Sequence, residues 1–111
     1  MSNFIHHGLA SGRWYTLSLM EQLGNIGSDV GRAISWQRRG DKEHRDKALE
    51  RALELFDLTI VDPRWRYRLH EITRAREVLC DVFYGDNSYG VSFEELEKYF
   101  LSFAYAARQG R

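Results

Sequence analysis

The chain has 111 residues, one cysteine, and 16 basic against 16 acidic side chains, which gives a formal net charge of zero. This length fits one domain, and a single cysteine excludes an intrachain disulfide and a cysteine-rich zinc site. No apolar run approaches the roughly 18 residues of a membrane span, and the first residues lack the order of a signal peptide, so we expect one soluble domain, residues 1–111, in the reducing cytoplasm and away from membranes.

Residues 1–10 are predicted to form a short N-terminal arm, followed by Ser11 as a candidate N-cap of the first helix. His6 and His7 are adjacent, and neighbouring positions on a helix point about 100° apart. We therefore interpret them as part of a packed or solvated arm rather than as a pair of metal ligands. The sequence predicts no metal site and no cofactor.

The first helix is predicted from Trp14 to about Gln37, and it carries two stripes. The apolar stripe recurs at steps of three and four and consists of Leu19, Leu23, Ile26, Val30 and Ala33. The second stripe contains small residues: Gly24, Gly27, Gly31 and Ser35. Each interior glycine costs about 1 kcal/mol relative to alanine. We therefore expect another helix, from this chain or from a second copy, to lie close against the small residues.

The second helix is predicted to open at Asp41, after the helix-stopping Gly40, and to end near Ile60. Its apolar face comprises Ala48, Leu49, Ala52, Leu55, Phe56, Thr59 and Ile60. Glu50 and Glu54 lie on the opposite face and alternate with basic residues at steps of three and four. This pattern favours a solvated face of ion pairs over paired carboxylates for acid–base chemistry.

The third helix is predicted to start at Asp62-Pro63, with the aspartate as N-cap and the only proline at the first helical position. Its core stripe comprises Trp65, Leu69, Ile72, Leu79 and Phe83. Cys80 falls at the edge of this stripe, where we interpret it as a buried, inert thiol rather than a nucleophile. The turn-forming stretch 84–90 ends the helix.

The fourth helix begins with Ser92 and Glu95 at the spacing of a capping box. Its apolar residues are Phe93, Leu96, Phe100, Phe103 and Ala107, and residues 109–111 are predicted to be a flexible tail. Four amphipathic helices with short connections and no strand pattern predict an all-α protein, an antiparallel up-down four-helix bundle. The small-residue stripe and the 15 aromatic residues lead us to expect a homo-oligomer.

Four arginines of the third helix, Arg64, Arg66, Arg68 and Arg74, are interleaved with aromatic residues. Such a pattern is typical of a surface that binds phosphates and stacks on bases, so these residues are candidates for RNA or DNA binding. The alternative is an outer face of ion pairs that Glu77 and Asp81 continue. The sequence leaves both interpretations open.

Arg64 is followed six residues later by His70, and this spacing resembles the Arg-x(4–6)-His motif of HEPN-type ribonucleases. In these four-helix proteins the pair lies across a dimer interface and cuts RNA without a metal. The resemblance implies a metal-independent ribonuclease or toxin as an alternative function. Arg39 and His44 show the same kind of spacing.

The overall pattern resembles a broad group of small bacterial and archaeal four-helix-bundle proteins. The features that carry the resemblance are the glycine-interrupted first helix, the segment Glu50–Leu55 (ERALEL) in the second, and an aromatic last helix that ends Ala106-Ala107-Arg108. The group includes ribosomal-RNA intervening-sequence proteins and the accessory variability determinant of diversity-generating retroelements. The resemblance implies a non-enzymatic, oligomeric accessory protein whose partner is a polymerase-like enzyme such as a reverse transcriptase, with or without its RNA.

Overall fold

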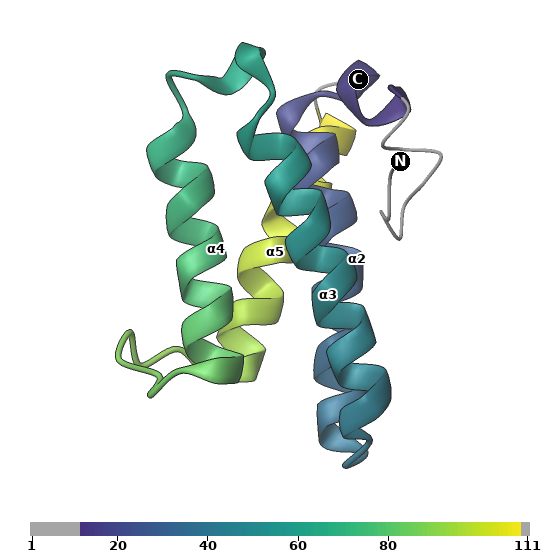
Figure 1. Ribbon diagram of the computed structural model, residues 1–111, viewed down its shortest axis with the longest axis vertical. Coiled ribbons are helices and arrows are strands. Elements are labelled where there is room, and N and C mark those ends of the chain that lie inside the picture. Colours follow the sequence, from purple (N-terminus) through teal and green to yellow (C-terminus); the bar gives the residue numbers. More distant parts are fainter. Residues whose placement is uncertain (1–11, 110–111) are drawn as a thin grey trace.

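The structure, a computed structural model, describes residues 12–109 and is all-helical over that range. The α-helices are α2 (Leu19–Arg38), α3 (Lys42–Ile60), α4 (Leu69–Tyr84) and α5 (Phe93–Gln109), and two 3-10 turns are η1 (Arg13–Thr16) and η2 (Pro63–Trp65). Figure 1 shows α2 and α3 side by side, with α4 at the opposite edge and α5 behind the space between them. Among these helices none is long and apolar enough to cross a membrane.

The first helix starts at Leu19, so the predicted start at Trp14 is wrong. Ser18 and Glu21 form a capping box: the Ser18 hydroxyl accepts the Glu21 N–H at 3.1 Å, and the Glu21 carboxylate accepts the Ser18 N–H at 3.0 Å. This box satisfies the backbone N–H groups of Ser18 and Glu21 and makes Ser18 the N-cap of the helix. Trp14 lies instead in η1, fully buried. The predicted cap Ser11, the arm 1–10 and both of its histidines lie outside the described residues.

The turn between α2 and α3 has the predicted form. Gly40 has a φ of +75°, a backbone conformation that glycine adopts without strain. Asp41 then caps α3 by accepting the His44 N–H at 3.1 Å.

The third helix starts at Leu69, and the predicted start at Pro63 is wrong. Asp62 does act as an N-cap and Pro63 does take the first position, but of the single 3-10 turn η2. The side chains of this turn are bound elsewhere: Arg64 binds back to Asp62, and the Trp65 indole donates to Gln22 at 2.9 Å. These contacts hold η2 apart from α4.

The core lies between α2, α3 and the inner faces of α4 and α5. All five residues of the predicted α2 stripe are buried, as are Leu49, Leu55 and Phe56 of α3 and Leu96 and Phe100 of α5. On α4 the buried residues are Ile72, Ala75 and Leu79, whereas Leu69 and Phe83 of the predicted stripe are only half-buried. The predicted apolar faces of α2 and α3 are therefore confirmed, and α4 is less deeply embedded than they are.

The helix that lies close against Gly24 and Gly27 is α5 of the same chain. A Cβ added to Gly27 would lie 2.9 Å from the Phe100 Cβ, and one added to Gly24 would lie 3.1 Å from the Ala104 Cα. At Gly31 an added Cβ would meet none of the described atoms within 4 Å. Close approach of α5 thus uses only one end of the small-residue stripe, and Ser35 at the other end is half-buried.

The last helix begins with the predicted capping box. The Ser92 hydroxyl accepts the Glu95 N–H and the Glu95 carboxylate accepts the Ser92 N–H, each at 3.1 Å. Gln109, the first residue of the predicted tail 109–111, is the last residue of α5. Residues 110–111 lie outside the described part of the chain.

Candidate binding site

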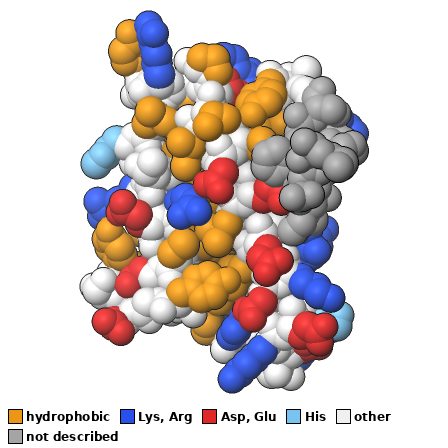
Figure 2. Space-filling model, in the orientation of Figure 1, with side chains coloured by type: hydrophobic (Ala, Val, Ile, Leu, Met, Phe, Trp, Pro, Cys, Tyr) orange, Lys and Arg blue, Asp and Glu red, His pale blue; other side chains and the backbone are white. Residues whose placement is uncertain are grey.

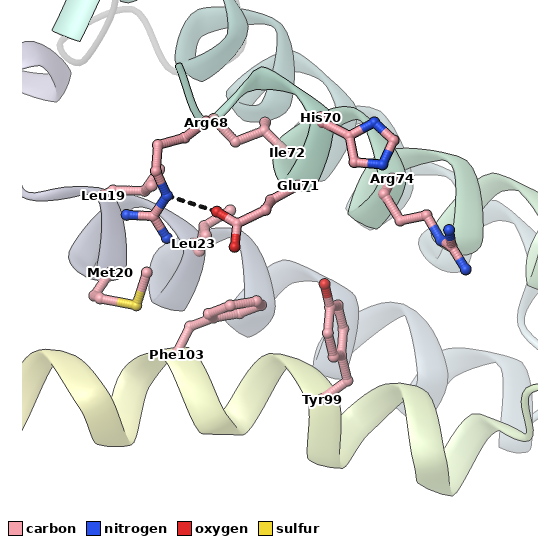
Figure 3. Close-up of a pocket in the computed structure, with 10 residues that line it drawn as sticks. All are labelled: Leu19, Met20, Leu23, Arg68, His70, Glu71, Ile72, Arg74, Tyr99 and Phe103. Carbon is pink, nitrogen blue, oxygen red and sulfur yellow. Dashed lines mark hydrogen bonds and ion pairs between the residues drawn. The ribbon is translucent and has the colours of Figure 1, made fainter. Parts of the chain in front are cut away.

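A cleft of about 320 Å³ opens where the first turns of α2 and α4 meet α5. Figure 3 shows its lining, with Tyr99 and Phe103 rising from α5 toward α4. The residues around it are Leu19, Met20, Leu23, Arg68, His70, Glu71, Ile72, Arg74, Tyr99 and Phe103. Apolar side chains form the floor, and charged or polar side chains of α4 stand at the rim.

A second hollow of about 240 Å³ continues along α4 and α5. It is lined by Arg74, Val78, Val91, Glu95, Leu96 and Tyr99. Arg74 and Tyr99 line both hollows, so the two adjoin along α4 and α5, and together we call them the α4–α5 groove. The depression exists because α4 does not pack closely along α5, whereas α5 packs tightly on the glycines of α2.

The rim of the groove is only partly neutralised. Arg68 forms an ion pair with Glu71, its neighbour on the next helical turn. Arg74 forms no ion pair with any described carboxylate; its guanidinium lies over the Tyr89 ring, 5.2 Å from the ring centroid. His70 is exposed and also lines the cleft. The groove therefore has an apolar floor and a rim with two arginines and two glutamates, and Arg74 is the lining arginine without an ion pair to a described residue.

The loop after α4 places Tyr89 under Arg74. The Asp81 carboxylate accepts the backbone N–H groups of Ser88 and Tyr89 at 3.0 and 3.1 Å, and the Tyr89 hydroxyl donates to Glu77 at 3.3 Å. The hydrogen bonds that Asp81 accepts, above all the one from the Tyr89 backbone N–H, lower the pKa of its carboxyl group. The loop is thus fixed to α4, and with it the ring that holds the Arg74 guanidinium.

Arg64 does not belong to this groove. Its guanidinium donates to both carboxylate oxygens of Asp62, at 2.7 to 3.2 Å, and to the backbone carbonyl of Leu17 at 2.8 Å. It also lies over the Trp65 ring, 4.3 Å from the ring centroid. The Arg64 hydrogen bonds are the main cause of the lowered pKa of Asp62. Arg64 is therefore a structural residue that ties η2 to the segment before α2.

Arg66 lines neither hollow of the groove. Its guanidinium lies 4.8 Å from the centroid of the Tyr67 ring and donates to the Tyr67 hydroxyl at 3.0 Å. Tyr67 is 86% exposed. Of the four arginines predicted to form one surface, the structure thus brings only Arg68 and Arg74 to a common site. Nor do Glu77 and Asp81 pair with them, since both are engaged with the 88–89 loop.

A buried polar network lies beside the cleft, and the sequence did not predict it. Gln22 is fully buried, and its side-chain amide donates to the Trp14 carbonyl at 2.9 Å and accepts from the Trp65 indole. The Trp14 indole in turn donates to the Thr59 hydroxyl at 3.0 Å. The one sequence signal was the position of Gln22, directly beside Leu23 on the apolar stripe. A polar residue there needs buried partners.

The structure gives no support for a shared Arg64–His70 site. His70 lines the cleft, whereas Arg64 is bound to Asp62 and is absent from the cleft lining. Cys80 is half-buried, and burial raises its pKa, which agrees with an unreactive thiol. Within residues 12–109 no group of three or more histidine, cysteine or acidic side chains is arranged to hold a metal ion.

No family model, curated protein or solved structure matches the chain significantly. The resemblance to small four-helix-bundle accessory proteins therefore stays a prediction.

Proposed function

We propose that the chain is a non-enzymatic binding protein that engages a protein partner through the α4–α5 groove. The observation that carries the proposal is the groove itself: two adjoining hollows of about 320 and 240 Å³ with an apolar floor, beside side chains that hydrogen-bond or stack. A groove with an apolar floor is a recurring form of site for a segment of a partner protein. The resemblance noted above suggests a polymerase-like enzyme as the partner, in the cytoplasm.

Charge favours a protein partner over nucleic acid. Of the predicted arginines, Arg64 is bound to the buried Asp62 and Arg68 to Glu71. Figure 2 shows hydrophobic side chains at the surface of one face, with acidic and basic side chains scattered among them and no continuous basic area. Nucleic-acid affinity depends on several basic side chains that are free of ion pairs within the protein and can each contact a phosphate.

The test uses one tyrosine of α5 and one of α4. Tyr99 lines both hollows, whereas Tyr84 is 56% exposed and lines neither. We expect the full chain to capture a protein partner from its native host, Tyr99→Ala to lose most of that capture, and Tyr84→Ala to retain it. Equal capture by all three proteins would contradict the proposal.

Nucleic-acid binding is the second candidate, and one observation favours it. Arg66 and Arg74 have no ion-pair partner in the described part of the chain, and each lies over an exposed tyrosine ring, Tyr67 or Tyr89. Paired guanidinium and aromatic groups are used by proteins that bind single strands.

We further propose an up-down antiparallel bundle that assembles as a homo-oligomer. Leu101 and Tyr105 of α5 are each 60% exposed, and the position beside Gly31 is open in the described chain. Exposed apolar side chains next to a small-residue stripe support contact with a second copy.

A further inference from the structure

The charged groups of the α4–α5 groove are unequally engaged. Arg68 is paired with Glu71, and the Glu95 carboxylate accepts the Ser92 N–H as part of a capping box. Arg74 lines both hollows and has no carboxylate partner among residues 12–109. Of the described arginines that line the hollows, Arg74 is therefore the one without an ion pair, and it belongs to the lining of both, with Glu71 in one hollow and Glu95 in the other.

The hollows have a shape that suits an elongated ligand. They follow one another along two helices and share only Arg74 and Tyr99. A helix presents side chains at positions i, i+3, i+4 and i+7 on one face, so it can place one apolar side chain in each hollow and a further side chain between them. A carboxylate at that middle position would form a charge-assisted hydrogen bond with the guanidinium.

We propose that the groove takes an amphipathic helix of the partner protein, with an apolar side chain in each hollow and a glutamate or aspartate between them bound to Arg74. This inference rests on the proposed function. The stack on Tyr89, which Asp81 and Glu77 hold in place, keeps the guanidinium near its position before the ligand arrives. Such preorganisation lowers the entropic cost of binding.

The probe is a phage-displayed library of helical peptides, selected on the full chain. We expect enriched peptides to carry an acidic residue three or four positions from an apolar residue on each side. Changing that acid to glutamine should weaken binding to the wild-type chain by about tenfold or more. The same change should have little effect on binding to Arg74→Gln. Arg66→Gln, which removes an exposed arginine outside the groove, is the matched control and should behave as wild type.

Three outcomes separate this inference from the proposed function. Enriched peptides that need Tyr99 but lack an acidic residue would overturn the inference and leave the groove as a protein-binding site. Acidic peptides whose affinity is unchanged by Arg74→Gln would overturn it in the same way. Failure to enrich any peptide whose binding depends on Tyr99 would contradict both. Circular dichroism of each variant verifies that it folds.

Discussion

Asp62 and Arg64 illustrate how one contact decides between a structural and a functional role. Asp62 is 2% exposed, caps η2 through the Arg64 N–H, and receives the Arg64 guanidinium on both carboxylate oxygens. A cation held in this way has little capacity left for a phosphate. The sequence could not show this, because an aspartate two residues before an arginine is equally compatible with a free arginine.

Replacing the Asp62 carboxylate should destabilise the fold. Asp62→Asn keeps the shape but leaves Arg64 without its counter-ion, and because Arg64 is partly exposed we expect a loss of about 2 kcal/mol at pH 7, below the range for fully buried pairs. Urea denaturation measures it. An unchanged unfolding midpoint would contradict this role.

The same pair predicts a pH dependence. Arg64 lowers the pKa of Asp62 below its ordinary value of 3.8. The ion pair therefore contributes its full share of the folding stability above pH 3.8, and this contribution is lost as the pH falls through the lowered pKa. The stability difference between wild type and Asp62→Asn should therefore shrink in strong acid. A difference that stays constant down to pH 2 would be inconsistent with the ion pair.

Arg66 and Arg74 are the residues that test nucleic-acid binding. If the chain binds RNA, Arg66→Ala and Arg74→Ala should each reduce the slope of log affinity against log salt by about 0.7 to 0.9. Lys42→Ala, in the first turn of α3, removes an exposed cation that the second candidate does not use and is the control. Absence of any gel shift with structured RNA at low salt would remove this candidate.

At the scale of elements, α2 and α5 meet through glycines. Gly27→Ala should destabilise the chain because its methyl group would lie 2.9 Å from the Phe100 Cβ. Gly31→Ala meets no described atom within 4 Å and should stabilise the helix by about 0.5 to 1 kcal/mol. Thermal unfolding of the two variants compares them directly, and equal effects of the same sign would contradict the assigned packing.

Periodicity predicted the elements well, and local signals misplaced two of their starts. The apolar stripes of α2 and α3 were predicted correctly because burial of one helix face imposes a period of 3.6 residues. The two starts were missed for different reasons. Ser18 with Glu21 replaced the earlier start expected at Trp14. The Asp62-Pro63 signal opens only a 3-10 turn, since Arg64 and Trp65 make long-range contacts that no local pattern encodes.

At the scale of the molecule, two positions test the proposed homo-oligomer. Leu101→Glu places a charge on an exposed apolar position of α5, and Gly31→Leu fills an open position of α2. If these surfaces join two copies, each variant should lower the mass measured by light scattering while leaving helicity unchanged. A wild-type chain that is monomeric at micromolar concentration would rule out the oligomer.

The α4–α5 groove was not predicted from sequence. Each residue that lines it belongs to an ordinary amphipathic pattern, and Tyr99 and Arg74 are on different helices. The depression arises from how closely the helices approach one another. The glycines of α2 bring α5 inward, while the turn at η2 sets where α4 begins. Relative helix placement depends on long-range packing, which helical periodicity does not specify.

Site-specific photo-crosslinking tests the groove as the partner site most directly. A photoreactive amino acid replaces Val78, which lines the second hollow, or Tyr84, which is exposed at the end of α4 and lines neither hollow. Irradiation in the native host should yield a covalent adduct with one protein partner from position 78 and little or none from position 84. Adducts from position 84 alone, or none from position 78 in a chain that still captures its partner, would contradict binding in the groove.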